Sequence, residues 1–372
     1  MSRILYWIAG ALMFMLTSCS RVGSELYLFV GTYAEESEAG IYLYRFNTED
    51  GSASFVRDMS GIGNPSWLAL DKEEKILYSV SETGAGASVY AYSFDRETAG
   101  LRLLDREETG GSGPCFIWVD SKRRLAVTAN YGGGSVSAFP LSATGELGAP
   151  SVYSREGGLS GAARQEAPHL HCIYASPDEK HLYANDLGTD RIYKYDLLPG
   201  QSGGILLKEG QPSFFSLPAG EGPRHTTFHP NGKYAYLISE LSGRVVVLRY
   251  DDGDFSPIQY IEADTLHAAG SADIHITPDG RFLYVSNRLK GDGLAIFAID
   301  RKSGRLTKTG YQPTGIHPRN FIITPDGKFL LCACRDTGVI QIFAIDKQSG
   351  LLKDTKKDIK VSRPVCLKFA NT

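Results

Sequence analysis

The chain has 372 residues, and its 41 glycines, 20 tyrosines and 17 phenylalanines against only 4 methionines favour strands and tight turns over helices. Its formal net charge of −3 excludes the strongly basic surface of a typical nucleic-acid-binding protein, so no nucleic-acid partner is expected. An anionic small molecule is not excluded, because a few local arginines can bind one whatever the net charge.

The N-terminal segment differs from the rest of the chain. Arg3 is followed by an uncharged apolar run over residues 4–16, which has the length of a signal-peptide core and is too short to span a bilayer comfortably. The run ends in Leu16-Thr17-Ser18-Cys19, which resembles the lipobox of bacterial lipoproteins. We therefore expect residues 1–18 to be a signal peptide, Cys19 to carry a lipid after cleavage, and residues 19–25 to be a short tether. The protein would then be exported and anchored to a membrane, at the periplasmic face or the cell surface; an ordinary signal peptide is the alternative.

Five cysteines follow Cys19, and they include no Cys-x-x-Cys pair. Cys332 and Cys334 lie two residues apart in an apolar run, which puts them on one face of a strand, where disulfide geometry is rare. We expect these cysteines to be small buried apolar residues. His169 and His171 could be two ligands of a metal ion, but no third ligand has convincing spacing, so neither a metal nor another cofactor is expected.

The chain contains a repeated unit. Each copy has a proline or small residue, an apolar run, a turn, a second apolar run that ends in a polar residue, and then a third strand-like segment. The copies start at Pro65, Pro114, Pro168, Pro223, Ala272 and Pro318, and a truncated seventh copy starts at Pro364. The starts lie roughly 46 to 55 residues apart, which is the spacing of four-stranded blades in a β-propeller. The first turn is often Pro-Asp-Gly, as at residues 278–280, because proline and glycine favour the φ angles of a tight turn.

The N-terminal part of the mature chain supplies what the seventh copy lacks. Strand-like segments at residues 26–33, 41–46 and roughly 54–59 precede the first full copy, while the C-terminus adds only one strand. Pairing the two ends in one blade would close the ring and leave no free sheet edge. We therefore predict an all-β fold in which residues 26–372 form one seven-bladed β-propeller, in preference to an open solenoid.

Polar residues flank the predicted inner strands, whose ends would meet at the mouth of the central channel. Their distribution is uneven, since four of the repeats carry most of them. They are His169, His171, Asp186, Asp190, Arg224, His225, Glu240, Asp273, His275, Asn287, Arg288, His317, Arg319, Asn320 and Arg335. Several of these residue types are costly to bury without partners, and a repeat that only had to pack could use Ser, Thr or Ala there. The pattern therefore predicts a functional site at the mouth.

Seven segments carry a resemblance to a known family. They are residues 130–136, 168–171, 185–190, 222–230, 239–241, 272–288 and 318–321. Together they resemble the bacterial lactonases of the seven-bladed propeller type, whose named activity is 6-phosphogluconolactonase and to which fungal carboxymuconate cyclase is related. The resemblance extends from about Leu26 to Phe369 and implies a hydrolase that opens a sugar lactone at the channel mouth.

The resemblance implies that His171, Arg224, Glu240 and Arg288 are catalytic. Lactone hydrolysis needs a base that activates water and a group that stabilises the oxyanion. Glu240 or His171 could be the base, while Arg224 or Arg288 could stabilise the oxyanion or hold a substrate carboxylate or phosphate. The candidates for substrate binding, of which His225 and His275 could instead support the inner strands, are His169, Asn130, Asp186, His225, His275, Asn287, Arg319 and Asn320.

The predicted export bears on the choice of substrate. The family's named activity serves a cytoplasmic pathway, whereas a phosphorylated sugar lactone is not an expected metabolite outside the cell. The substrate could therefore be an unphosphorylated sugar lactone. Two alternatives stay open, namely a non-catalytic surface propeller that binds a carbohydrate or protein ligand, and a lactonising enzyme that acts on carboxylated dienes such as muconates. The protein is expected to be a monomer.

Overall fold

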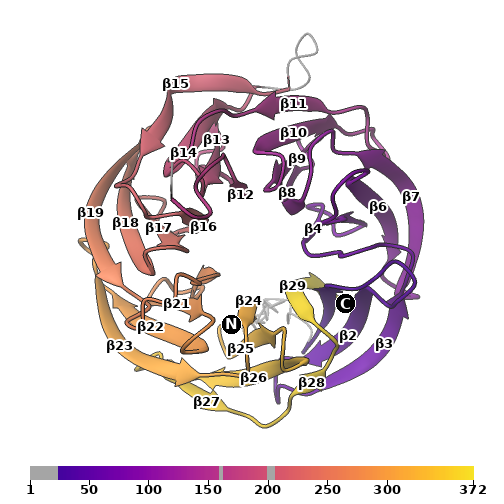
Figure 1. Ribbon diagram of the computed structural model, residues 1–372. Coiled ribbons are helices and arrows are strands. Elements are labelled where there is room, and N and C mark those ends of the chain that lie inside the picture. The colour runs from indigo at the N-terminus through magenta and orange to yellow at the C-terminus, as the bar shows by residue number, and fades with distance from the viewer. Residues whose placement is uncertain (1–23, 159–161, 199–205) are drawn as a thin grey trace, which may run out of the picture.

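The described part of the chain consists of strands, turns and loops. The computed structural model describes residues 24–158, 162–198 and 206–372, so the predicted signal peptide and Cys19 lie outside the described residues. The strands form seven antiparallel sheets around a central axis, which confirms the predicted β-propeller (Figure 1). Within the described ranges, no helix is long and apolar enough to cross a membrane.

The blades are numbered from the one that contains both chain ends, and their strands are given from the innermost outward. Blade 1 contains β29 (Pro364–Asn371), β1 (Glu25–Thr32), β2 (Ile41–Asn47) and β3 (Ala53–Met59), and blade 2 contains β4 (Leu68–Leu70), β5 (Ile76–Val80), β6 (Ser88–Asp95) and β7 (Gly100–Glu108). Blade 3 contains β8 (Pro114–Asp120), β9 (Leu125–Asn130), β10 (Ser135–Pro140) and β11 (Ser151–Ser154), and blade 4 contains β12 (Leu170–Ala175), β13 (His181–Asp186), β14 (Arg191–Asp196) and β15 (Lys208–Ser216). Blade 5 contains β16 (Pro223–Phe228), β17 (Tyr234–Ser239), β18 (Arg244–Asp251) and β19 (Asp254–Glu262), and blade 6 contains β20 (Ile274–Ile276), β21 (Phe282–Asn287), β22 (Gly293–Ile299) and β23 (Leu306–Pro313). Blade 7 contains β24 (Pro318–Ile323), β25 (Phe329–Cys334), β26 (Val339–Ile345) and the short outer strands β27 (Leu352–Asp354) and β28 (Ile359–Lys360).

Blade 1 is built from both ends of the chain, as the truncated repeat predicts. The C-terminal strand β29 pairs antiparallel with β1, from Leu26 opposite Asn371 to Gly31 opposite Cys366. The backbone N–H of Leu68, in the inner strand of blade 2, donates to Sγ of Cys366 at 3.3 Å, so the closing strand also contacts the next blade. The strand starts one residue earlier than expected, because Glu25 pairs with Asn47 and belongs to β1 and not to the tether.

Tyrosines in the second strands link five of the seven blades to the next one. The phenol of Tyr236 in blade 5 donates to the carbonyl of Gly304 in blade 6 at 2.8 Å. Equivalent contacts to the following blade are made by Tyr27, Tyr78, Tyr183 and Tyr284. A buried phenol needs a hydrogen-bond partner, and the turn of the neighbouring blade supplies one. The tyrosine of the repeat therefore serves the contact between blades.

The two ends of the central axis differ. At one end, which we call the mouth, the inner strands begin and the second strands end, as with β16 from Pro223 and β17 to Ser239. The opposite face carries the turns between these two strands. Strand β1 begins at Glu25 on that opposite face, and its eight residues, at about 3.3 Å each, carry the chain about 25 Å to the mouth. The described chain thus enters the propeller from the face opposite to the mouth.

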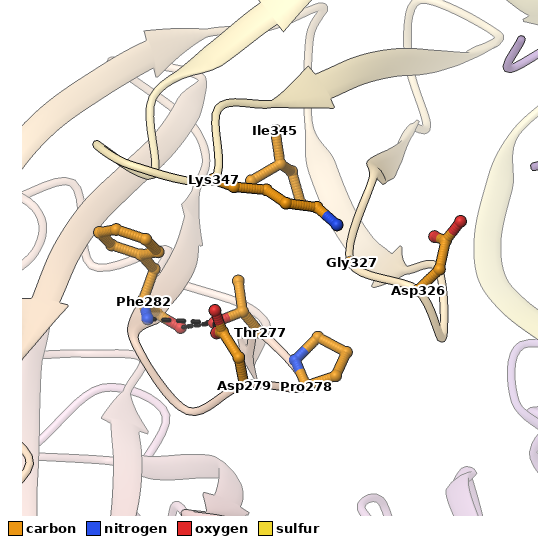
Figure 2. Close-up of a pocket in the computed structure, with 8 residues that line it drawn as sticks. All are labelled: Thr277, Pro278, Asp279, Phe282, Asp326, Gly327, Ile345 and Lys347. Atoms are coloured by element: carbon orange, nitrogen blue, oxygen red, sulfur yellow. Dashed lines mark hydrogen bonds between the residues drawn. The ribbon is translucent and has the colours of Figure 1, made fainter. Parts of the chain in front are cut away.

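A small cavity lies between blades 6 and 7 on the face opposite to the mouth (Figure 2). Its volume is about 120 Å³, and the Pro-Asp-Gly turns of the two blades line it together with Phe282, Ile345 and Lys347. Thr277 Oγ1 donates to Asp279 at 2.6 Å and accepts the backbone N–H of Phe282 at 3.1 Å, which fixes one turn. None of the predicted site residues lines this cavity, so it belongs to the packing between blades.

Replacing Tyr236 with phenylalanine tests the contact between blades. The variant keeps the buried ring but leaves the Gly304 carbonyl without its donor, so we expect the free energy of unfolding to fall by about 1–2 kcal/mol. Urea unfolding followed by circular dichroism measures this change. Tyr260→Phe is the control, because Tyr260 is 38% exposed and its hydroxyl should contribute less than ~0.5 kcal/mol. Equal stability of Tyr236→Phe and the wild type would show that the contact is not stabilising.

Candidate active site

In several inner strands, irregular pairing at the mouth leaves one residue per strand without a partner on the second strand. Pro223 pairs with Ser239 and His225 pairs with Ile238, so Arg224 between them has no partner on β17. Such a β-bulge twists the strand and re-aims the side chain of the extra residue. The same place is taken in blades 3, 4 and 7 by Cys115, His171 and Arg319. Three predicted site residues therefore occupy one structural position in different blades.

A second set of equivalent positions follows the second strands. Glu240 comes directly after β17, and Arg288 comes directly after β21. Because all second strands end at the mouth, the residues in this position form a ring around it. From blade 1 to blade 7 they are Tyr33, Glu82, Tyr131, Leu187, Glu240, Arg288 and Arg335, and in blade 2 one residue, Ser81, separates Glu82 from the end of β5.

Glu240 joins three arginines at the mouth. Its Oε1 accepts hydrogen bonds from Arg288 Nη2 at 2.9 Å and from Arg164 Nη2 at 2.5 Å. Its Oε2 lies 2.8 Å from Arg224 Nε. The side chains of Glu240, Arg224 and Arg288 are 6%, 2% and 5% exposed, whereas that of Arg164 is 41% exposed. The structure thus brings three of the four predicted catalytic residues into contact.

The charges around Glu240 favour its ionised form. Burial by itself would raise the pKa of Glu240, but the three guanidinium groups outweigh burial and lower the pKa from 4.5 to about 2. Burial and the other arginines of the mouth lower the pKa of Arg288 to about 9, although Glu240 acts in the opposite direction. The cluster therefore has more positive charge than its buried carboxylate neutralises. Such a site favours an anion or a developing negative charge.

One loop holds both buried arginines. Arg224 Nη1 donates to the carbonyl of Ala272 at 2.5 Å, and Arg288 Nε donates to the carbonyl of Gly270 at 2.6 Å. The same loop, which precedes β20, contains Ala269 with a positive φ angle of 53°. Non-glycine residues seldom adopt such an angle, so the contacts of the loop must maintain it. The loop therefore sets the direction of both guanidinium groups relative to Glu240.

Asp273 organises the side chains next to the arginine cluster. Its carboxylate lies 2.8 Å from His225 Nδ1 and 3.0 Å from His275 Nε2, and it accepts a hydrogen bond from Asn320 Nδ2 at 2.5 Å. Burial opposes ionisation, but the two histidines hold the pKa of Asp273 well below its usual value. We assign the proton of His225 to Nδ1, which leaves Nε2 as an acceptor 3.3 Å from Arg224 Nη1. Three predicted substrate-binding residues are thus bound to a buried carboxylate.

Aromatic rings meet across the central axis beside Arg224. Trp67 of blade 2 and Phe116 of blade 3 stack with centroids 4.2 Å apart, and both contact His225 of blade 5, at 5.2 and 5.7 Å. His171 of blade 4 lies 5.2 Å from His225. Burial and Arg224 lower the pKa of His171 well below 6.5, so its ring is neutral at pH 7. Within the described chain, His171 Nδ1 is buried without a hydrogen-bond partner, a state that a water or ligand could satisfy.

His169 and His171 both contact the ring of Tyr131. His169 stacks on this ring with centroids 4.4 Å apart, and its Nδ1 lies 2.9 Å from the Tyr131 carbonyl. His171 meets the same ring edge-on at 5.6 Å. Tyr131 lay inside one of the motifs that carry the family resemblance, but it was not among the predicted site residues.

Three other predicted binding residues hold the loops around the mouth. Asp186 accepts the backbone N–H groups of His169 at 2.6 Å and Gly188 at 2.9 Å. Asn130 donates to the hydroxyls of Ser135 and Ser137, and Asn287 donates to the carbonyl of Ala263. All three side chains are buried, at 0%, 0% and 1% exposure for Asp186, Asn130 and Asn287. In this structure their polar groups are engaged with the protein and shape the mouth.

Arg319 belongs to a second charged group at the mouth. Its Nη2 lies 3.9 Å from Glu82 Oε2, and its guanidinium lies over the ring of Tyr33, 5.1 Å from the centroid. Tyr33, Glu82 and Arg164 were not among the site residues predicted from the sequence. Glu82 could have been found, because it holds the same place in its repeat as Glu240. Arg164 lies in the loop between β11 and β12, outside the repeated unit, and offered no such signal.

Among the residues that the structure describes, the cysteines and other candidate ligands form no metal site. Cys115, Cys172, Cys332, Cys334 and Cys366 are free and buried. The Sγ atoms of Cys332 and Cys334 are 4.0 Å apart, too far for a disulfide. In the part of the chain that the structure describes, no group of three or more His, Cys, Asp or Glu side chains could hold a metal ion.

Known proteins are similar to this chain in sequence and in architecture. Over residues 27–369 the chain matches the family model described as Lactonase, 7-bladed beta-propeller. It is 36% identical over 348 residues to a 6-phosphogluconolactonase of Bacillus subtilis, which covers 92% of this chain and 97% of that protein. A 6-phosphogluconolactonase of Formosa agariphila is 34% identical over 343 residues, or 90% of this chain and 97% of that protein.

Solved structures agree with this assignment. A protein of Bacteroides fragilis, provisionally assigned as a 6-phosphogluconolactonase, is 49% identical with a TM-score of 0.91, and the match covers 94% of this chain and 99% of that one. A periplasmic gluconolactonase of Pseudomonas aeruginosa is 33% identical with a TM-score of 0.88, and the match covers 94% and 100%. By sequence and fold together, this chain belongs to the lactonase family of seven-bladed β-propellers.

Proposed function

We propose that the protein is a hydrolase that opens a sugar lactone at the mouth of the propeller. The observation that carries this proposal is the buried cluster in which Glu240 holds Arg224 and Arg288 side by side. Water adds to the lactone carbonyl, whose oxygen gains negative charge before the ring C–O bond breaks and the hydroxy acid leaves. Guanidinium groups that are already fixed, and that exceed the local negative charge, stabilise this oxyanion without reorganising.

Glu240 acts in this proposal as an anchor for the arginines. A pKa of about 2 makes its carboxylate a weak proton acceptor near pH 7. His171 is also a weak base, because burial and Arg224 lower the pKa of its ring. Its Nδ1, unpaired within the described residues, is suited to a hydrogen bond with the attacking water or with a substrate hydroxyl.

The names of the relatives support a sugar lactone as the substrate class. The Bacillus subtilis relative is a 6-phosphogluconolactonase, and the Pseudomonas aeruginosa structure is a periplasmic gluconolactonase. The substrates in these two names are both cyclic esters of gluconic acid, and they differ by one phosphate group. The excess positive charge of the mouth is compatible with a phosphate, whereas the predicted export favours the unphosphorylated lactone. Both compounds therefore belong in the test.

Arg224→Met and Glu240→Gln test the site. Protein without residues 1–19 is assayed on gluconolactone and on its 6-phosphate, with spontaneous opening subtracted. We expect the wild type to accelerate the opening of at least one lactone, and each variant to lower kcat/KM by about 10²–10³-fold. Arg249→Met, which removes an exposed arginine of the same blade, should keep full activity. Persistent turnover in both site variants would place the reaction elsewhere, and an inactive wild type would favour the non-catalytic binding propeller.

The anchoring role of Glu240 predicts a pH-dependent contribution to stability. Because the arginines lower the pKa of Glu240 from 4.5 to about 2, the ionised carboxylate stabilises the folded state above pH 4.5, and this contribution is lost as the pH falls toward 2. The difference in unfolding free energy between the wild type and Glu240→Gln should therefore shrink over that range. Urea unfolding at several pH values measures it, with Glu108→Gln at an exposed position as the control. A difference that is constant from pH 7 to pH 2 would contradict the anchoring role.

We propose further that a lipid on Cys19 tethers the mature protein to a membrane. The segment Leu16-Thr17-Ser18-Cys19 supports this proposal. Only residues 20–24 separate Cys19 from β1, which begins at Glu25 on the face opposite to the mouth. A tether attached at that face would leave the arginine cluster on the side that points away from the bilayer.

Metabolic labelling with radioactive palmitate tests the lipid anchor. The full-length wild type should be labelled and should sediment with membranes, whereas Cys19→Ala should lose both properties because the acceptor thiol is gone. Cys115→Ala is the matched control, since Cys115 is buried in the propeller and its loss should not change labelling. Undiminished labelling of Cys19→Ala would contradict the assignment.

A further inference from the structure

Glu82 is a second carboxylate at the mouth, and the proposed mechanism leaves it without a role. It occupies in blade 2 the position that Glu240 occupies in blade 5, after the second strand of the blade. Its side chain is 21% exposed, whereas that of Glu240 is 6% exposed. Glu82 is therefore the more accessible of the two carboxylates in this ring.

The neighbours of Glu82 orient it without saturating it. Tyr33 donates its hydroxyl to the carboxylate, with distances of 3.0 and 2.9 Å to the two oxygens. Arg319 Nη2 is 3.9 Å away, too far for a hydrogen bond. Burial and, after it, the charge of Glu82 raise the pKa of the Cys115 thiol. Glu240, in contrast, contacts three guanidinium groups within 2.9 Å.

Arg319 connects Glu82 with the arginine cluster that would hold the reacting carbonyl, because it lies 3.9 Å from Glu82 and its charge acts on Arg224. Burial lowers the pKa of Arg319, but Tyr33 and the charges of Glu82 and Glu240 outweigh burial and raise it, so both carboxylates interact electrostatically with this guanidinium. Arg319 also occupies the same bulge position as Arg224 in its own blade. A ligand bound against the arginines would therefore have Glu82 and Tyr33 as neighbours on the side of blades 1 and 2.

Hydrolysis requires a group that accepts a proton from water. The two bases suggested by the sequence are both weak, since the guanidinium groups lower the pKa of Glu240 to about 2, and burial together with Arg224 lowers the pKa of His171 well below 6.5. A base must also have a free lone pair that water can reach. Three guanidinium groups within 2.9 Å occupy the oxygens of Glu240, whereas Glu82 has one guanidinium at 3.9 Å and a side chain that is 21% exposed. Glu82 fits this requirement better than Glu240 does.

We propose that Glu82 is the general base of the lactonase reaction and that Tyr33 positions its carboxylate. One O–H bond of water breaks, its proton moves to Glu82, and the water oxygen forms the new bond to the lactone carbonyl carbon. When the ring C–O bond breaks, the ring oxygen takes the proton from Glu82, which returns to its starting state. The overall change is the addition of one water, and no other reactant is needed. This inference rests on the proposed lactone hydrolysis.

The test compares Glu82→Gln with the wild type on the lactone that the wild type opens. Loss of the base should lower kcat by about 10²–10⁴-fold with KM changed less than ~3-fold, and should remove the acidic limb of the pH–rate profile. Formate added to Glu82→Ala should restore part of the activity, since a small carboxylate can take the vacated place. Tyr33→Phe should lower kcat less than Glu82→Gln, because the carboxylate remains. Glu108→Gln is the control for removing an exposed carboxylate at another place.

Three outcomes would contradict the proposal, and they distinguish a dispensable Glu82, a purely structural Glu82 and a protein that is not a lactonase. Activity of Glu82→Gln within ~3-fold of the wild type, with the protein folded by circular dichroism, would overturn the role of Glu82 and leave the lactonase proposal intact. A loss of activity with an unchanged pH profile and no rescue by formate would make Glu82 only a counterion of Arg319, which also overturns the inference. A wild type that opens no lactone would remove the proposed function and the role of Glu82 with it.

Discussion

Closure of the ring is the constraint on which the rest of this structure depends. Each sheet buries its faces against the neighbouring blades, and an open row of blades would leave both terminal blades with an uncovered face. The pairing of β29 with β1 joins the two chain ends in blade 1 and removes this problem. Because the ring is closed, the inner strands all begin at one end of the axis. Residues that are far apart in the sequence, such as Glu82 and Arg319, become neighbours there.

The site at the mouth arises from small departures from the regular repeat. A regular ladder would alternate side chains between the faces of the inner strand, but a bulge inserts one extra residue whose side chain the pairing does not constrain. Blades 4, 5 and 7 place His171, Arg224 and Arg319 in this position. The residues after the second strands add Glu240 and Arg288. The scaffold therefore stays regular while the chemistry varies from blade to blade.

The charges at the mouth determine what each group can do. Glu240 is so strongly held by arginines that it orients them and loses its value as a base. The arginines in turn receive support from backbone carbonyls of a single loop and from the pair of His225 and Asp273. Such second contacts fix the guanidinium groups before a substrate arrives, which is the condition for electrostatic stabilisation of an oxyanion. Burial and the same positive charge lower the pKa of His171, whereas Glu82, with a side chain that is 21% exposed, is the carboxylate at the mouth that water can reach.

The sequence by itself determined the seven-bladed fold and most of the residues at its mouth. Turn chemistry and strand periodicity are local, and a truncated repeat at one end with matching strands at the other implies closure. The limits of the three N-terminal strands agree with the expected ones within about a residue, as with Glu25. The sequence could not decide which polar residues stay free, because hydrogen-bond partners such as Asp273 for His225 and Asn320 come from different blades. It also missed Arg164, which reaches Glu240 from a loop outside the repeat. Only the tertiary structure decided these partnerships, because burial and charge at the mouth depend on side chains that meet across the axis and not along the chain.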